Sequence, residues 1–145
     1  MRVNKLNLTF SSLPENVTIA RTLVSTLGAQ LDLPINELEE LKVAVSEAVS
    51  NSIIHGYSNN PNNFVTIEIE SSSEKIQIQV VDHGCGIEDV KQAMQASFST
   101  DPDRMGLGFI FMQSFMDELH VESTLNSGTK VIMTKYLNHS HPSSH

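Results

Sequence analysis

The chain has 145 residues, with 17 acidic and 9 basic side chains and a formal net charge of −8. This length fits one domain, and the acidic balance disfavours binding to nucleic-acid phosphates. A single cysteine, Cys85, excludes an internal disulfide and disfavours a zinc site, while no apolar run is long enough to span a bilayer. We therefore expect a soluble cytoplasmic domain that contacts neither nucleic acid nor membrane.

The first sixty residues predict one strand and two helices. Leu6–Phe10 alternates apolar and polar residues, as a strand with one buried face does. Ser12–Glu15 has the spacing of a helix-capping box, and a helical apolar stripe follows it: Val17, Ala20, Leu23, Val24 and Leu27. A second helix is expected to begin with Asn36 as its cap and to end at Gly56.

The rest of the sequence predicts two hairpins and two further helices. Strands are expected over 64–70, 75–81, 118–123 and 129–135, and helices over 88–94 and 107–116. The polar segment 97–105 is interpreted as a mobile loop. This order favours an α+β fold over residues 1–137, a two-layer sandwich with helices on one face of a mixed, mostly antiparallel sheet. Residues 138–145 are predicted to be a disordered tail.

The second helix carries three polar residues at intervals of four. Glu47, Asn51 and His55 share one side of the helix, away from its apolar stripe. A carboxylate can serve as a base, and an amide oxygen one turn away can ligate Mg²⁺ beside a nucleotide. The same spacing also fits a solvated helix face. His55 fits either a role near a phosphate group or a hydrogen bond near the helix C-terminus.

Three glycine-containing segments follow this helix in order. They are Asp82–Ile87, Gly106–Gly108 and Ser127–Thr129. Glycine lets the backbone approach a ligand closely. Each segment alone also fits an ordinary turn, but all three together with the helix motif indicate an ATP site.

On these residues the chain resembles the GHKL ATPase superfamily. Within it the sequence is most similar to the sporulation anti-sigma-F factors of endospore-forming bacteria, small serine kinases with the histidine-kinase-like ATPase (Bergerat) fold. The resemblance runs from about Leu6 to Leu137 and is most specific in Val45–Tyr57, Asp82–Ile87 and Met105–Glu118. It implies ATP and Mg²⁺ as cofactors. It also implies a homodimer that binds a sigma-F type sigma factor and phosphorylates a serine of an anti-anti-sigma factor.

The resemblance also implies roles for single residues. Glu47 would be the catalytic base, and Asn51 would bind the nucleotide through Mg²⁺. Asp82 would accept a hydrogen bond from the exocyclic amine of adenine, with Gly84 and Gly86 close beneath the base.

A lid over the phosphates is implied for Ser97–Gly108. Further nucleotide contacts would come from Thr100, Gly106, Gly108 and Thr129. Arg104 would be a catalytic cation that stabilises charge on the transferred phosphoryl group. The lid is shorter than in many relatives, and Asp101 stands where many of them carry lysine.

Arg21 on the first predicted helix would contact both protein partners. The sequence alone makes it a surface arginine, and only the resemblance gives it this role. Two other functions stay open: a general-stress anti-sigma serine kinase, and a nucleotide-gated binding module without phosphotransfer. Glu47 argues against the second, because ATP binding alone needs no base. A histidine-kinase module would need a helix pair bearing a phosphoacceptor histidine, which this sequence does not predict.

Overall fold

The computed structural model describes residues 2–95 and 105–137. The described elements are β1 (Asn4–Ser11), α1 (Asn16–Gln30), α2 (Ile35–Asn51), the π-helical turn η1 (Ser52–Gly56), β2 (Phe64–Ser71), β3 (Lys75–Asp82), α3 (Val90–Gln95), α4 (Met105–Phe115), β4 (Glu118–Thr124) and β5 (Gly128–Tyr136). Most of the predicted loop over 97–105 and the whole predicted tail lie outside the described residues. None of the helices within the described ranges is both long and apolar enough to cross a membrane.

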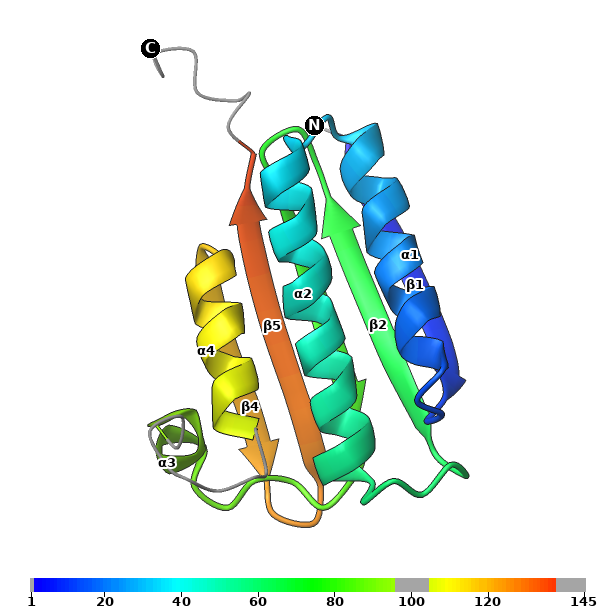
Figure 1. Cartoon of the computed structure of the whole chain (residues 1–145), viewed down its shortest axis with the longest axis vertical. Coiled ribbons are helices and arrows are strands. Elements are labelled where there is room, and N and C mark those ends of the chain that lie inside the picture. Colours follow the sequence, from blue (N-terminus) through cyan, green and yellow to red (C-terminus); the bar gives the residue numbers. More distant parts are fainter. Residues whose placement is uncertain (1, 96–104, 138–145) are drawn as a thin grey trace.

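The five strands form one sheet in the order β1-β2-β3-β5-β4. Every neighbouring pair is antiparallel, so the mixed component that the sequence analysis expected is absent from the described sheet. For β1 and β2, the antiparallel pairing follows from the two helices that lie between them in the chain. Because α1 and α2 run in opposite directions, the chain enters β2 from the end at which β1 stopped (Figure 1).

Helices α1, α2 and α4 cover one face of this sheet, with α2 in the middle (Figure 1). The alternating residues of the strands face these helices. The buried core includes Ile67 and Ile69 of β2, Ile76, Ile78 and Val80 of β3, and Ala44, Val45, Ala48 and Val49 of α2. The predicted two-layer α+β sandwich is confirmed.

The capping box predicted before the first helix is wrong. The hydroxyl of Ser12 donates to the carbonyl of Asn60 at 2.7 Å and accepts from the amide of Asn63 at 3.2 Å. It therefore holds the loop before β2, a tertiary contact that local spacing does not reveal. Helix α1 begins at Asn16, whose side chain donates back to the carbonyl of Ser11 at 2.9 Å.

The cap predicted at Asn36 is also wrong. Helix α2 begins one residue earlier, at Ile35, and follows Pro34 without a side-chain cap. Proline has a fixed φ and no amide hydrogen, so it suits the start of a helix, where amide groups have no intrahelical partner. The predicted end at Gly56 is confirmed, because η1 extends α2 to that residue.

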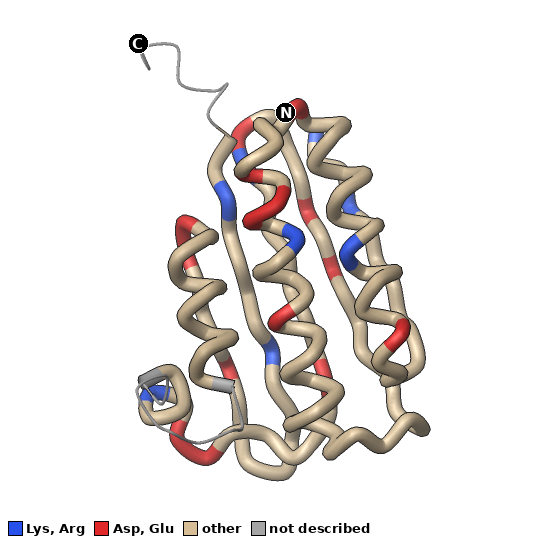
Figure 2. The backbone as a smooth tube through the Cα atoms, in the orientation of Figure 1, with Lys and Arg blue, Asp and Glu red and all other residues tan. Residues whose placement is uncertain are grey.

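A buried lysine joins three elements at the end of the molecule where α2 begins. Lys135 of β5 is 7% exposed, and its Nζ donates to the carbonyl of Phe115, the last residue of α4, at 3.1 Å. The same nitrogen lies 3.9 Å from Glu37 Oε1 and 3.7 Å from Glu40 Oε1. Figure 2 shows how acidic residues recur along α2. A cation here satisfies the C-terminus of α4 and the carboxylates of α2 together.

Replacing Lys135 with methionine should lower the free energy of unfolding by about 1–3 kcal/mol, because the carbonyl of Phe115 loses a hydrogen bond and two carboxylates lose a nearby cation. Urea unfolding followed by circular dichroism measures this change. The control is Lys75→Met at an exposed position at the start of β3, which should change stability by less than about 0.5 kcal/mol. Equal stability of the two variants would contradict a stabilising role for the buried lysine.

Candidate functional site

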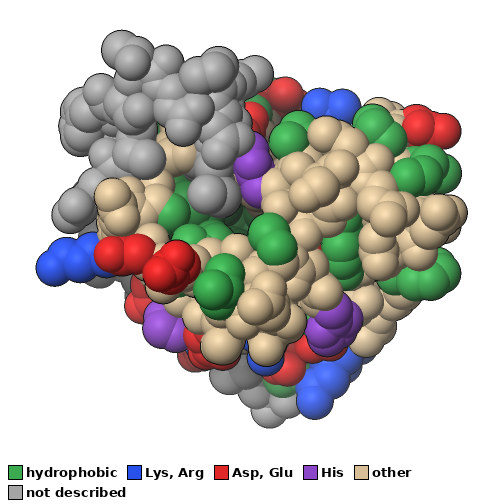
Figure 3. Space-filling view, turned by 90° about the horizontal axis from the view of Figure 1, so that it is seen from below, with side chains coloured by type: hydrophobic (Ala, Val, Ile, Leu, Met, Phe, Trp, Pro, Cys, Tyr) green, Lys and Arg blue, Asp and Glu red, His purple; other side chains and the backbone are tan. Residues whose placement is uncertain are grey.

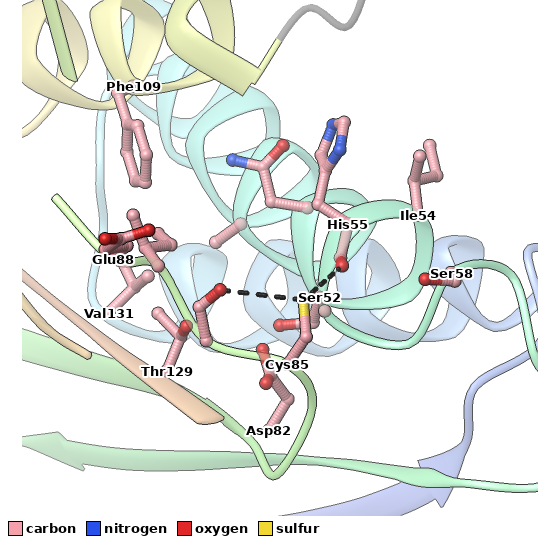
Figure 4. Close-up of a pocket in the computed structure, with 15 residues that line it drawn as sticks. Ser52, Ile54, His55, Ser58, Asp82, Cys85, Glu88, Phe109, Thr129 and Val131 are labelled. Atoms are coloured by element: carbon pink, nitrogen blue, oxygen red, sulfur yellow. Dashed lines mark hydrogen bonds between the residues drawn. The ribbon is translucent and has the colours of Figure 1, made fainter. Parts of the chain in front are cut away.

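A cavity of about 390 Å³ lies where α2 ends. Its lining comes from α2 and η1, the loop after β3, α4 and β5. The lining residues are Ala48, Asn51, Ser52, Ile54, His55, Gly56, Ser58, Asp82, Cys85, Gly86, Ile87, Glu88, Phe109, Thr129 and Val131. Figure 3 shows this end of the molecule, with hydrophobic, acidic and histidine side chains around the hollow. In Figure 4, Phe109 and His55 lie across the cavity from Asp82 and Thr129.

The cavity brings together four of the eight residues predicted to bind a nucleotide. Asn51, Asp82, Gly86 and Thr129 all line it. Gly84 does not, but it packs against the backbone of Gly56, which does. Segments that are far apart in the sequence therefore meet around one cavity.

Glu47 lies beside this site, one turn before Asn51 on α2. A Cβ atom on Gly108 of α4 would stand 3.0 Å from Glu47 Oε1 and 3.3 Å from Asn51 Nδ2. The glycine therefore lets α4 pass close to both polar side chains.

The amide of Asn51 has an unsatisfied buried end. Its Nδ2 has less than 1 Å² of exposed surface and no hydrogen-bond partner within the described ranges. A buried donor without a partner is costly, and native structures contain few of them. A carboxamide can present its N–H to a phosphate oxygen and its oxygen to Mg²⁺, so a bound Mg-nucleotide fits this position.

Asp82 is held rigidly at the opposite side of the cavity. It is 3% exposed, and its Oδ1 accepts from the amide of Gly84 at 2.9 Å. A Cβ on Gly56 would stand 3.1 Å from both oxygens of this carboxylate. The side chain is therefore packed between η1 and its own loop, with a defined orientation toward the cavity.

The loop after β3 is bound tightly to the end of η1. The amide of Cys85 donates to the carbonyl of Gly56 at 2.8 Å, and its Sγ donates to the carbonyl of His55 at 3.1 Å (Figure 4). A Cβ on Gly84 would collide with the Gly56 carbonyl, and Gly86 has a φ of +74°. Both glycines are required by the backbone, in addition to any contact with a ligand.

Thr129 belongs to a hydroxyl cluster at the edge of the cavity. Its Oγ1 lies 2.8 Å from Ser123 Oγ, which accepts from the amide of Ile87 at 2.7 Å. The same serine donates to the carbonyl of Gly128 at 2.9 Å. The final hairpin is thereby joined to the loop after β3, and Thr129 is directed along the cavity wall.

Two further predicted residues, Gly106 and Arg21, do not line the cavity. Gly106 is buried in the first turn of α4, whose amide groups suit an anion. Thr100, Asp101 and Arg104 lie outside the described residues. Arg21 lies instead on α1, where a smaller hollow of about 180 Å³ is lined by Arg21, Thr22, Ser25, Thr26 and Lys42.

Sequence reasoning missed several residues of the site. Gly56 was interpreted only as a helix stop, and Phe109 and Val131 were not singled out within the helix predicted over 107–116 and the strand predicted over 129–135. The signal for Gly56 was its place directly after the polar side of α2. Phe109 and Val131 carry no such signal, since an apolar residue that lines a cavity has the same periodicity as one in the core.

Comparison with known proteins finds relatives of nearly full length. A family model described as histidine kinase-like ATPase domain matches residues 10–135. A protein of Thermoanaerobacter sp. (strain X514) named anti-sigma F factor is 51% identical over 136 residues, covering 92% of this chain and 94% of the relative. The anti-sigma F factor of Clostridium novyi (strain NT) is 48% identical over 139 residues, covering 94% and 97%.

Solved structures share the fold at low sequence identity. The RsbU and RsbW domains of a Mycobacterium tuberculosis protein match with a TM-score of 0.64 and 15% identity, over 91% of this chain and 31% of theirs. The histidine kinase domain of a blue-light activated kinase from Erythrobacter litoralis matches with a TM-score of 0.58 and 16% identity, over 89% of this chain and 62% of its own. These likenesses confirm the predicted histidine-kinase-like ATPase fold.

Replacing Gly84 with alanine should weaken nucleotide binding about tenfold or more, because the new methyl group pushes the loop away from Gly56 and displaces Asp82. Isothermal titration with ATP measures the affinity, and thermal unfolding measures the accompanying loss of stability. Ser73→Ala, in the exposed turn between β2 and β3, is the matched control. An unchanged affinity in the Gly84 variant would show that the loop adapts and does not position the site.

Proposed function

Because the chain belongs to the anti-sigma F factor family and carries a histidine kinase-like ATPase domain, we propose that it is an ATP-dependent serine kinase that inhibits a sporulation sigma factor. Its substrate is a serine of an anti-anti-sigma factor in the cytoplasm. The observation that carries the chemistry is one continuous site, with the Asp82 carboxylate on one wall of the cavity and Asn51 and Glu47 beside the start of α4.

Adenine selection is assigned to the Asp82 side of the cavity. Asp82 Oδ1 already accepts from Gly84, and the second carboxylate oxygen is suited to accept from the exocyclic amine of adenine. Guanine carries a carbonyl at this position, and two acceptors facing each other repel. GTP should therefore bind more weakly than ATP.

Mg²⁺ is proposed to bind through Asn51 and the phosphates. No group of three or more carboxylate, histidine or cysteine side chains within 2–95 and 105–137 is arranged to hold a metal ion. Mg²⁺ does not need such a group, because it keeps several waters and binds through few protein oxygens plus phosphate oxygens. When bound, the ion neutralises charge on the phosphates.

Glu47 is proposed to accept the proton of the attacking serine. The serine oxygen forms a bond to the γ-phosphorus, the bond from that phosphorus to the β–γ bridging oxygen breaks, and ADP leaves. The proton moves from the serine hydroxyl to a Glu47 carboxylate oxygen. Arg104 and Thr100, which lie outside the described residues, retain their proposed roles in stabilising the transferred group and contacting the nucleotide.

Protein partners are proposed to dock at α1. Arg21 makes no ion pair with the described part of the chain, and three hydroxyl side chains and Lys42 surround it. Such a hollow suits an acidic side chain of a partner. The sigma factor and the unphosphorylated anti-anti-sigma factor would compete for it, and phosphorylation would release the latter. A homodimer, as implied by the family resemblance, belongs to this proposal.

Replacing Glu47 with glutamine should lower the rate of phosphotransfer by roughly 10²–10⁴-fold, since the side chain keeps its shape but loses the base. ATP affinity should stay within about twofold of wild type. Transfer of labelled phosphate from ATP to the purified anti-anti-sigma factor measures the rate, and titration calorimetry measures the affinity.

Asn51→Ala is the complementary variant, and it should weaken binding of Mg-ATP as well as transfer. A Glu47→Gln variant that phosphorylates its partner at the wild-type rate would exclude Glu47 as the base. Complete absence of transfer in wild type, with ATP-dependent partner binding, would instead identify a nucleotide-gated binding module.

Replacing Arg21 with glutamate should weaken binding of both protein partners by about 30-fold or more, because an attractive charge pair becomes repulsive. ATP affinity should not change, since Arg21 lies in a separate hollow. Pull-down titrations with the sigma factor and the anti-anti-sigma factor test the first expectation. Lys5→Glu on the exposed edge of β1 is the charge-matched control. Wild-type binding of both partners by the Arg21 variant would exclude α1 as their docking site.

A further inference from the structure

Tyr57 is a buried polar residue that the proposed chemistry does not use. It follows η1 directly and is 8% exposed. Its Oη donates to the carbonyl of Phe64 at 2.7 Å and accepts from the amide of His83 at 2.7 Å. The phenol therefore joins the end of α2 and η1 to the beginning of β2 and to the end of β3.

The bond to His83 acts directly on Asp82. The amide nitrogen of His83 belongs to the peptide unit that follows Asp82, so its hydrogen bond fixes the orientation of that unit. A rotation of this peptide changes the ψ angle of Asp82 and moves its carboxylate. Gly84 holds one oxygen of the same carboxylate at 2.9 Å, so Tyr57 and Gly84 hold Asp82 through the peptide that follows it and through its own side chain.

The π-helical turn brings Tyr57 to this position. The amide of Tyr57 donates to the carbonyl of Ser52, five residues earlier, at 2.9 Å. Turns of this kind occur frequently at functional sites. Here the turn also places Gly56 against the Asp82 carboxylate and its carbonyl against the amide of Cys85 at 2.8 Å. The helix that carries Asn51 is thereby connected to the proposed adenine-reading residue.

The chemistry of a phenol suits this position. Burial raises the pKa of Tyr57 above its ordinary value, the hydrogen bond from the His83 amide lowers it, and the nearby Asp82 carboxylate raises it. The hydroxyl thus stays protonated at neutral pH and can donate one hydrogen bond while accepting another. Phenylalanine fills the same volume but can do neither.

We propose that Tyr57 is a positioning residue for adenine selection: its hydroxyl fixes the peptide after Asp82, and so the carboxylate that reads the exocyclic amine. This inference rests on the proposed function, because it assumes that Asp82 contacts adenine. The inference adds Tyr57 to the residues that determine the choice of base, and it explains how the geometry of η1 affects that choice.

The test compares ATP with inosine triphosphate, which carries a carbonyl oxygen in place of the exocyclic amine. Wild type should bind ATP about tenfold or more tightly than inosine triphosphate. Tyr57→Phe should lose about five- to tenfold in ATP affinity but less than about twofold in affinity for inosine triphosphate. The preference for adenine therefore shrinks, as it does in Asp82→Asn, which alters the reading group itself.

Two controls separate positioning from general destabilisation. Tyr136→Phe removes a hydroxyl that donates to Glu118 Oε2 at 2.9 Å in an exposed hydrogen bond between β5 and β4, and it should leave both affinities unchanged. Lys135→Met lowers stability at the other end of α2 and should leave the ratio of the two affinities unchanged. A purely structural effect of Tyr57→Phe would lower both affinities by the same factor, and that outcome would overturn the inference.

The outcomes also separate this inference from the proposed function. If wild type binds both nucleotides equally, Asp82 does not read adenine, so that assignment and the role of Tyr57 both fail, while the kinase activity is tested separately by phosphate transfer. If wild type discriminates and Tyr57→Phe keeps the full ratio, only the role of Tyr57 fails.

A second measurement needs no variant and applies even if Tyr57→Phe does not fold. Hydrogen exchange in wild type should show the His83 amide protected to the same degree as the amides of β3. Rapid exchange at His83 beside protected neighbours would overturn the inference.

Discussion

The site depends on a backbone contact between the end of η1 and the loop after β3. Gly56 and Gly84 touch without any side chain between them, and the amide of Cys85 donates to the Gly56 carbonyl. This contact brings α2, with its carboxylate and carboxamide, beside Asp82. A side chain at Gly84 would separate the two segments and open the cavity. The glycines of this loop are therefore required by the packing of the backbone, independently of any contact with a nucleotide.

Helices α2 and α4 lie side by side, and different residues connect them at their two ends. At one end Gly108 lies against Glu47 and Asn51, where the phosphates of a nucleotide are proposed to bind. At the other end Lys135 joins the last residue of α4 to the first turns of α2. The helices run antiparallel (Figure 1). Lys135 therefore fixes the C-terminal end of α4 against the start of α2, while the N-terminal end of α4 lies next to Glu47 and Asn51.

Helix α2 also borders both candidate surfaces. Lys42 lines the hollow around Arg21, and Asn51 lines the cavity for the nucleotide. The proposed sites for partner docking and for nucleotide binding therefore lie at separate positions along one helix. Under the proposed function, a sigma factor and a phosphorylation substrate could both bind at the hollow around Arg21 without occupying the nucleotide site.

The sequence by itself determined the order of the elements, the polar side of α2 and the glycine segments, because hydrophobic periodicity and glycine positions depend on local structure. It thereby predicted that Glu47, Asn51 and Asp82 belong to one site, and the structure places Asn51 and Asp82 in one cavity with Glu47 beside it. Tertiary structure decided the hydrogen-bond partners of Ser12, the residue at which α2 begins and the antiparallel course of the whole sheet. Tertiary structure also made Gly56 and Phe109 part of the cavity lining, and it placed the hydroxyl of Tyr57 against the amide of His83. Each of these depends on contacts between residues far apart in the chain, such as the bond from His83 to Tyr57, and no local pattern records which distant groups will meet.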